Sequence, residues 1–115
     1  MMVFVARLAL GIAFALFVVD SAAKAEDQAA PIQVTIKDHR FSPSEIHVKA
    51  GTPNFLEITN QDAEPEEFEM RQLAIEKVIP AGATGRVRLR PLGPGRYAFI
   101  GEFHEDMAQG DVVAE

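Results

Sequence analysis

The sequence predicts an all-β fold of seven or eight short strands, arranged as a sandwich or a barrel, and two observations carry this prediction. After residue 31, most segments alternate apolar and polar residues, which is the pattern of strands with one buried face. Turn-forming residues interrupt these segments at intervals of roughly 8–12 residues, as they do in small all-β domains. The chain contains no cysteine, so neither disulfides nor thiolate chemistry is available to it.

The expected strands follow one another with little between them. They cover residues 32–36, 46–48, 55–59, 66–70, 87–89, 97–100 and 111–114. Turns rich in glycine, proline, asparagine or aspartate are expected at residues 50–53, 60–62 and 92–95. A single helical turn near residues 72–76 is the one expected departure from strand and loop.

The first 25 residues have the three parts of a secretory signal peptide. Arg7 supplies the basic start, residues 8–19 (LALGIAFALFVV) form a short apolar run, and an A-x-A cleavage point precedes Glu26. A membrane-spanning helix needs about twenty apolar residues, so this run is short for an anchor, and an uncleaved anchor is the alternative interpretation. We therefore expect a signal peptide over 1–25, a linker over 26–31 and one domain over 32–115. After cleavage, no segment is expected to insert into the membrane.

The charge of the exported part narrows the classes of partner. Loss of Arg7, Lys24 and Asp20 with the leader changes the formal net charge from −6 to −7. This composition lacks the basic stripe that nucleic-acid binding needs, so no nucleic-acid partner is expected. An acidic surface attracts cations instead.

Two acidic segments hold most of the unusual chemistry. Residues 64–69 contain four glutamates, and residues 101–107 (GEFHEDM) place His104 among three acidic side chains. An acidic run alone is more often a solvated face, and a histidine among acids can be a surface ion pair. Imidazole together with carboxylates is nevertheless a common ligand set for transition metals, to which the thioether of Met107 would add a soft donor.

Over residues 32–115 the sequence resembles the cupredoxins. The matching landmarks are FSPSEI at 41–46, AGT at 50–52, ITN at 58–60 followed by Pro65, PGxYxF at 94–99, and Met107 three residues before Gly110. The resemblance implies a cupredoxin-like Greek-key β-sandwich. Two positions depart from the blue-copper pattern, because Glu66 stands at the first histidine and Gly101 at the cysteine. Without the thiolate ligand a blue-copper centre is not expected.

The departures resemble one subgroup, the cupredoxin-like domains of bacterial iron uptake. These are the N-terminal domain of EfeO-type proteins and the stand-alone periplasmic component of Ftr-type ferrous iron permease systems. The similar segments are PEEFE at 65–69, EKVI at 76–79, GEFHED at 101–106 and DHxF at 38–41. The resemblance implies a periplasmic protein that handles copper, iron or both. It also implies two partners, an inner-membrane iron permease and an associated periplasmic iron-binding protein.

Six residues are candidate metal ligands. His104 falls on the C-terminal copper histidine, and strand alternation places Glu66 on the inward face with Phe68 and Met70. The resemblance adds His39 and Glu67. Glu102 is a candidate because it follows the position of the missing cysteine, and Met107 is one because it has the spacing of an axial methionine. For each, the alternative is an ordinary loop, surface or core residue. His47 and the arginines at 86, 88 and 90 are expected to be solvent-facing, and Met70 to be core.

Three functions are compatible with these residues. The leading one is a metal-binding protein of ferrous iron uptake, with copper as cofactor and iron as substrate or ligand, acting in Fe(II) oxidation or delivery. Whether it turns over as an accessory ferrous iron oxidase is left open by the sequence. The alternatives are a copper chaperone or buffer without redox turnover, and a metal-free interaction module.

Overall fold

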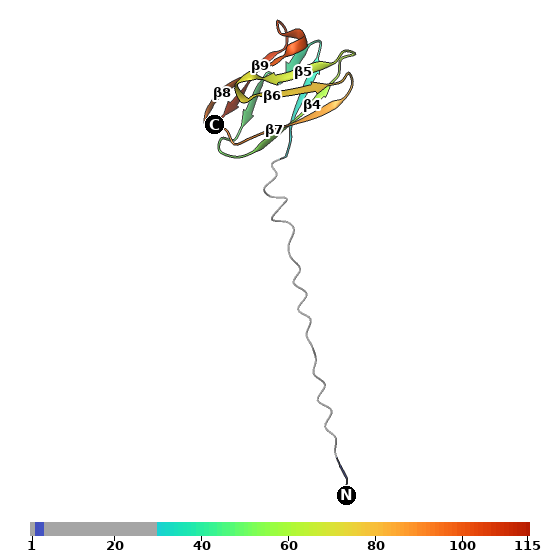
Figure 1. Ribbon diagram of the computed structural model, residues 1–115, viewed down its shortest axis with the longest axis vertical. Coiled ribbons are helices and arrows are strands. Elements are labelled where there is room, and N and C mark those ends of the chain that lie inside the picture. Colours follow the sequence, from blue (N-terminus) through green and yellow to red (C-terminus); the bar gives the residue numbers. More distant parts are fainter. Residues whose placement is uncertain (1, 4–29) are drawn as a thin grey trace.

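The computed structural model describes residues 2–3 and 30–115 of the chain. Apart from residues 2 and 3, the predicted signal peptide and the linker as far as residue 29 lie outside the described residues. Nine strands follow, with a 3-10 turn after the fifth and another after the eighth (Figure 1). They are β1 (Ile32–Lys37), β2 (Arg40–Ser42), β3 (Glu45–Val48), β4 (Asn54–Asn60), β5 (Glu66–Met70), η1 (Arg71–Leu73), β6 (Ile75–Ile79), β7 (Thr84–Leu89), β8 (Gly95–Gly101), η2 (Glu102–His104) and β9 (Gln109–Ala114).

The all-β sandwich prediction is confirmed. One sheet has the order β2-β1-β4-β7 and the other has the order β3-β9-β8-β5-β6. The structure adds two strands to the seven segments picked out in the sequence. One is β2, which has three residues, and the other is β6, where the helical turn expected near residues 72–76 is the short η1 instead. Within the described part of the chain, no helix is both long and apolar enough to cross a membrane.

The core lies between the two sheets and follows from strand alternation. In β4 and β7 every second side chain is buried, which is the period-2 pattern of a strand packed on one face. Three phenylalanines fill the part of the core near η2: Phe41 lies edge-on to Phe68 and Phe99, at ring-centroid distances of 5.9 and 5.0 Å. Edge-to-face packing of this kind is favoured by the ring quadrupoles. The three rings form the apolar layer beside η2, next to which the candidate site lies.

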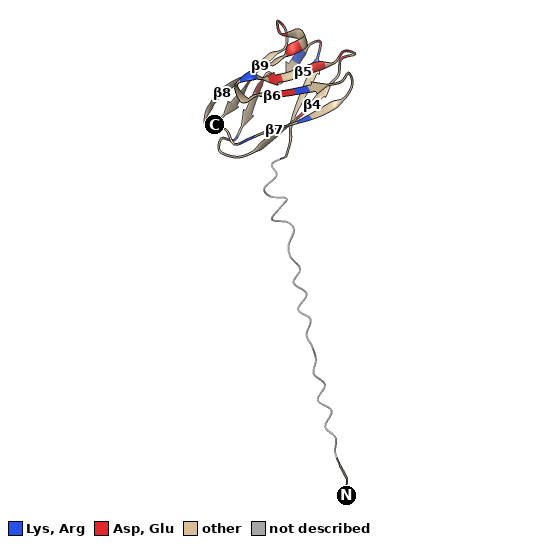
Figure 2. Cartoon of the chain, viewed as in Figure 1, with Lys and Arg blue, Asp and Glu red and all other residues tan. Residues whose placement is uncertain are grey.

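Loops that come from distant parts of the sequence meet at one end of the sandwich. The η2 turn lies at the end opposite to the start of β1 (Figure 1). A loop at residues 61–65 joins β4 to β5 there, and the two-residue turn between β1 and β2 lies beside it. Acidic residues mark η2, β5 and β6 in this part of the molecule (Figure 2). We call it the η2 end.

Candidate metal centre

Glu66 is the buried anchor of the η2 end. Strand β5 turns its side chain inward with Phe68 and Met70, as alternation predicted, and the residue is 1% exposed. Its Oε1 accepts the backbone N–H groups of Glu67 and Phe103, each at 3.0 Å, and its Oε2 lies 2.7 Å from His104 Nδ1. A buried carboxylate is costly unless it is paired and hydrogen-bonded, and these three contacts meet that requirement. They also tie β5 to η2.

Gly101 makes room for this carboxylate. In the ladder between β5 and β8, Gly101 is the partner of Phe68. A Cβ atom built on Gly101 would lie 2.6 Å from Glu66 Cδ and 2.9 Å from its Oε1, closer than such contacts allow. The two departures from the blue-copper pattern therefore depend on each other, because the carboxylate of Glu66 occupies the space that a side chain at position 101 would need.

His39 reaches the same end from the turn between β1 and β2. Asp38 and His39 have φ of 51° and 59°, the left-handed conformation at both central positions of a tight two-residue hairpin turn. Neither is glycine, so the conformation needs outside support. Asp62 gives it, since its two carboxylate oxygens accept the N–H groups of Asp38 at 2.8 Å and His39 at 3.0 Å. The bond from His39 is the main reason that the pKa of Asp62 lies below its usual value.

Asn60 fixes the loop that carries Asp62. Its side chain is fully buried and donates to the carbonyl oxygens of Glu64 at 2.8 Å and Ile79 at 3.1 Å. Its Oδ1 accepts the N–H of Asp62 at 3.0 Å. Because both the amide and the carbonyl of one side chain are used, the loop at 61–65 is held in place.

The two histidines stack over Glu64. The rings of His39 and His104 lie with their centroids 3.6 Å apart and their planes 15° from parallel. Glu64 Oε2 is 3.2 Å from His104 Nε2 and 3.9 Å from His39 Nε2. The hydrogen bond to Glu66 raises the pKa of His104, with a further contribution from Glu64, against the opposing effect of burial. Carboxylates beside both ring nitrogens thus favour the protonated form of His104.

The arrangement fits a metal ion bound by nitrogen and oxygen. His39, Glu66 and His104 each offer a ligand atom, and the three atoms lie within 4.8 Å of one another. The side chains of His39 and His104 are 31% and 20% exposed, so an ion can reach them from solvent. Two imidazoles and a carboxylate suit copper, iron or zinc, and the absence of a thiolate is inconsistent with a blue-copper centre.

The six candidate ligands do not gather in one place. His39, Glu66 and His104 converge, whereas Glu67 and Glu102 lie in a separate group with Glu76. Met107 lies on the His39 side of this end of the sandwich. It is 37% exposed and lines a surface pocket with His39 and four other residues, namely Asp38, Asp62, Ala63 and Glu64.

Sequence reasoning missed Asp62 and Glu64 as partners of the histidines. Their signal was the acidic character of the loop after residue 60, which cannot be assigned to a histidine without the packing of that loop. The expectation for His47 matches the structure, since its side chain is 56% exposed and lies beside Glu45 and Glu115. Met70 is fully buried.

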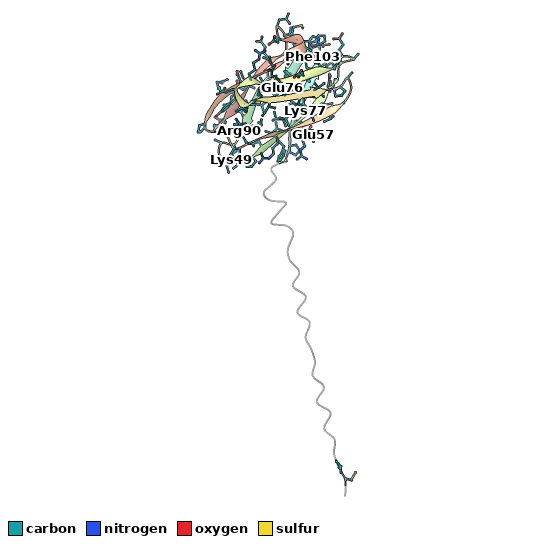
Figure 3. The ribbon with its side chains drawn as sticks, in the orientation of Figure 1. Lys49, Glu57, Glu76, Lys77, Arg90 and Phe103 are labelled. Atoms are coloured by element: carbon teal, nitrogen blue, oxygen red, sulfur yellow. The ribbon has the colours of Figure 1, made fainter. Side chains whose placement is uncertain are left out.

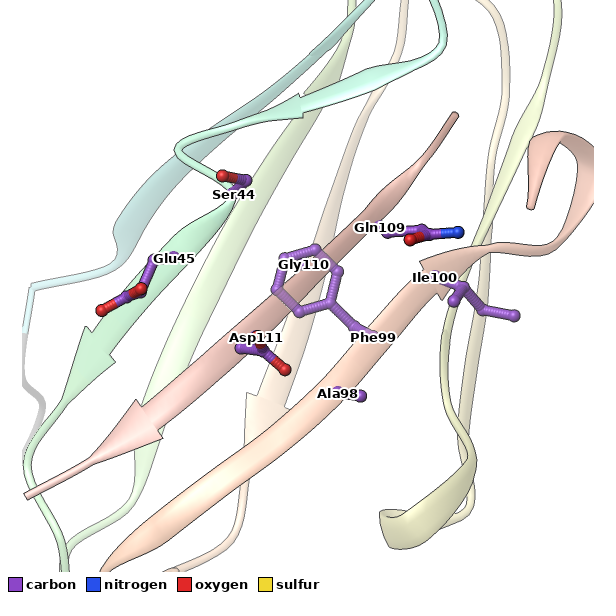
Figure 4. Close-up of a pocket in the computed structure, with 8 residues that line it drawn as sticks. All are labelled: Ser44, Glu45, Ala98, Phe99, Ile100, Gln109, Gly110 and Asp111. Carbon is purple, nitrogen blue, oxygen red and sulfur yellow. The ribbon is translucent and has the colours of Figure 1, made fainter. Parts of the chain in front are cut away.

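A second pocket lies away from this chemistry, between β3 and the β8–β9 hairpin (Figure 4). Gly110 is at its centre, where a Cβ would overlap the Phe99 ring and the Ser44 carbonyl oxygen. Its two carboxylates, Glu45 and Asp111, are each 3.5 Å from the guanidinium of Arg96. Because these charges are already paired, the pocket offers no free ligand set.

Comparisons with known proteins agree with the fold. The sequence model of the Cupredoxin-like domain family matches residues 8–114. An uncharacterized protein of Rickettsia prowazekii (strain Madrid E) is 39% identical over 90 residues, which are 78% of this chain and 72% of that protein.

Two solved structures have the same fold. The first is the metal binding domain, with Cu(I), of the Streptococcus pneumoniae Cu(I) exporting P-type ATPase CopA. It has a TM-score of 0.66 and 17% identity, over 74% of this chain and 84% of that one. A Cu(I) form of an amicyanin variant has a TM-score of 0.61 and 23% identity, over 79% of this chain and 88% of that one. The chain belongs to the Cupredoxin-like domain family.

Proposed function

We propose that this is an exported metal-binding protein of ferrous iron uptake, in which His39, Glu66 and His104 hold copper or iron. In this function the protein assists Fe(II) oxidation or delivers iron to an inner-membrane permease. The observation that carries the proposal is the convergence of two imidazoles and one buried carboxylate within 4.8 Å. Copper in the structurally similar proteins and the resemblance to EfeO-type and Ftr-type domains support it.

The donor set supports redox chemistry that differs from electron shuttling by blue copper. A bound copper or iron ion would supply a one-electron redox centre. Imidazole suits copper, while hard carboxylate oxygen favours the higher oxidation state of iron. The chain's own part is to hold Glu66 fixed through the N–H groups of Glu67 and Phe103. Such pre-organised oxygen ligands favour Fe(III) over Fe(II) and so favour oxidation.

The location and partners follow from the leader and the resemblance. Cleavage of residues 1–25 would release the domain into the periplasm, beside the iron permease and its periplasmic iron-binding protein. The mass of the protein isolated from the periplasmic fraction tests this step. A mature chain that begins at Glu26 is expected, and a periplasmic species that retains residues 1–25 would contradict it.

The oxidation step is tested by following aerobic Fe(III) formation, in which each Fe(II) loses one electron to dioxygen. The copper-loaded protein is expected to accelerate it above the same concentration of free copper. Glu66→Gln should reduce this rate, because an amide has the shape of the carboxylate without its charge. His47→Gln is the matched control, since His47 lies on an exposed strand face. If wild type, both variants and free copper give one rate, the oxidase function is wrong.

A copper chaperone or buffer is the second candidate, and the exposure of the two histidines favours it. Ligands that are 20–31% exposed allow a partner to take the ion by exchange. Rapid transfer of Cu(II) to a competing chelator, together with no acceleration of Fe(II) oxidation, would support this function over the first. Retention of copper against the chelator would argue against it.

A further inference from the structure

The outward side of the β2-β1-β4-β7 sheet is basic, although the chain as a whole is acidic. Alternation turns every second side chain of these strands outward, and Glu57 is the one acidic residue among them. We call this side the basic face, after its four basic residues Lys37, Arg40, Arg86 and Arg88. It extends from the edge strand β7 to the turn that carries His39, since Lys37 and Arg40 flank that turn. Figure 3 labels Glu57, which lies in the half of the domain away from Phe103.

The outward side of the other sheet has the opposite charge. Arg96 in β8 is the one basic residue that alternation turns outward there. The acidic residues on the same side are Glu45, Glu67, Glu69, Glu76 and Asp111. A domain with opposite charges on its two sides is oriented by the electrostatic field of a charged partner, so the basic face would turn toward an acidic one.

The arginines on the two sides differ in their partners. On the acidic side, the guanidinium of Arg96 lies 3.5 Å from carboxylate oxygens of Glu45 and Asp111. Within residues 30–115, by contrast, neither Arg86 nor Arg88 forms an ion pair with a carboxylate. Both side chains are exposed. Their hydrogen-bond donors are therefore available to a group outside the chain.

Arg86 is held in position without being neutralised. Its ladder partner in β4 is Glu57, but the Glu57 carboxylate lies 3.4 Å from the side-chain amide of Gln33 on the opposite strand. The guanidinium of Arg86 lies instead over the Phe55 ring, 4.4 Å from the ring centroid. Stacking on an aromatic ring uses the flat face of a guanidinium and leaves the N–H groups at its edge free to donate. Arg88 is the ladder partner of Phe55, so both arginines lie beside the same ring.

We propose that the basic face is the docking surface for a protein partner whose contact surface is acidic, with Arg86 and Arg88 as the main contacts. A guanidinium binds a carboxylate through two parallel N–H···O bonds, and arginine and aromatic residues are enriched in protein interfaces. β7 is the last strand of its sheet, so the two arginines can be reached from the sheet edge as well as from its face. This inference does not depend on the proposed function, because it uses no metal ligand.

Two other occupants fit the basic face less well. An anionic lipid surface would favour apolar side chains that enter the bilayer, but the exposed large apolar residues of the described domain, Val78, Phe103 and Met107, lie elsewhere. A second copy would meet the basic face with its own acidic side. Such a head-to-tail contact does not close on itself, so it would lead to open-ended assemblies.

The test is titration of the isotope-labelled full chain with poly-L-glutamate at low ionic strength, followed by nuclear magnetic resonance. The amide signals of β4 and β7 are expected to shift, while those of β3 and β9 stay in place. Arg86→Gln/Arg88→Gln should weaken binding by roughly tenfold, because it removes two charge-assisted contacts. Arg71→Gln/Arg96→Gln is the matched control, since it removes the same charge from exposed arginines outside the basic face. The spectrum of each variant also reports whether the fold is retained.

Four outcomes would overturn the proposal. Equal weakening by the two double variants would mean diffuse attraction by charge, and unchanged β4 and β7 signals would mean that this face binds no acidic polypeptide. Tighter binding to phosphatidylglycerol vesicles than to poly-L-glutamate, lost in Arg86→Gln/Arg88→Gln, would assign the face to lipid. Salt-sensitive self-association in sedimentation, lost in the same variant, would assign it to a second copy.

Phe55 is a positioning residue of this surface, since it acts through Arg86. Phe55→Leu keeps an apolar side chain and removes the ring, so it should weaken poly-L-glutamate binding by roughly two- to fivefold. In an Arg86→Gln background the same change should have no effect, because the stacked guanidinium is already gone. Equal weakening in both backgrounds would refute this role of Phe55.

Discussion

The most informative single change is Gly101→Ala, because it adds one methyl group against the carboxylate of Glu66. The added Cβ would lie 2.6 Å from Glu66 Cδ and 2.7 Å from the Ala108 Cβ, in a part of the core where all three residues are buried. Overpacking of this kind costs about 1–3 kcal/mol. Displacing the carboxylate also deprives the N–H groups of Glu67 and Phe103 of their acceptor, at about 1–3 kcal/mol.

The expected loss is therefore roughly 2–6 kcal/mol of unfolding free energy, a large part of the total stability of a small domain. Urea unfolding followed by circular dichroism measures it, and Cu(II) titration of the folded variant should show weaker binding as well. Gly93→Ala is the matched control. Its Cβ would meet nothing closer than the Tyr97 hydroxyl at 3.8 Å, so it should change stability little.

A double-mutant cycle separates the carboxylate from general crowding. In a Glu66→Ala background the contact with Glu66 is gone and only the contact with Ala108 remains. Gly101→Ala should then cost at least about 1 kcal/mol less than in wild type. The reasoning is refuted if the cost is the same in both backgrounds, or if Gly101→Ala is as mild as Gly93→Ala.

Three further predictions concern the histidines. His104→Ala should weaken Cu(II) binding by roughly 100-fold or more, whereas His47→Ala should leave it unchanged, and equal effects in the titration would place the site elsewhere. Asp62→Ala removes the acceptor of the turn that carries His39, so it should lower stability by about 1–2 kcal/mol in urea and weaken Cu(II) binding; unaltered binding would show that the turn holds itself. The hydrogen bond to Glu66 raises the pKa of His104 above its unfolded value of about 6.5. Without metal, the hydrogen bond should therefore stabilise the fold fully below about pH 6.5, and this stabilisation should be lost as the pH rises through the folded pKa. Copper affinity should change in the opposite direction, rising as the proton leaves, and a His104→Gln variant with the same pH dependence of unfolding would contradict the assignment.

Strand periodicity was enough to predict the sandwich and the orientation of Glu66. In β5 the alternation of side-chain direction places Phe68 and Met70 in the core, and Glu66 must follow them whatever its charge. The same reasoning placed His47 on the surface. These features depend on neighbours within one strand, which the sequence displays directly.

The grouping of the ligands could not be predicted, because it depends on pairing between strands. Glu67 and Glu102 were predicted as candidate ligands together with His104, and in the structure their carboxylates converge with Glu76. The start of β6 was expected as a helical turn. In the structure β6 pairs Glu76 with Glu69, and the carboxylate of Glu76 groups with those of Glu67 and Glu102. The role of Asp62 was hidden for a similar reason, since it binds a turn more than twenty residues earlier.

The histidine centre takes its donors from both layers of the sandwich. His39 belongs to the hairpin of the β2-β1-β4-β7 sheet, while Glu66 and His104 belong to the other sheet and to the turn that follows β8. An ion bound there would connect the two sheets. Release of the ion and separation of the sheets at the η2 end would therefore be thermodynamically coupled. Metal loading should then slow amide hydrogen exchange in β2 and at the start of β5 together, and leave the exchange near the chain's C-terminus as it was.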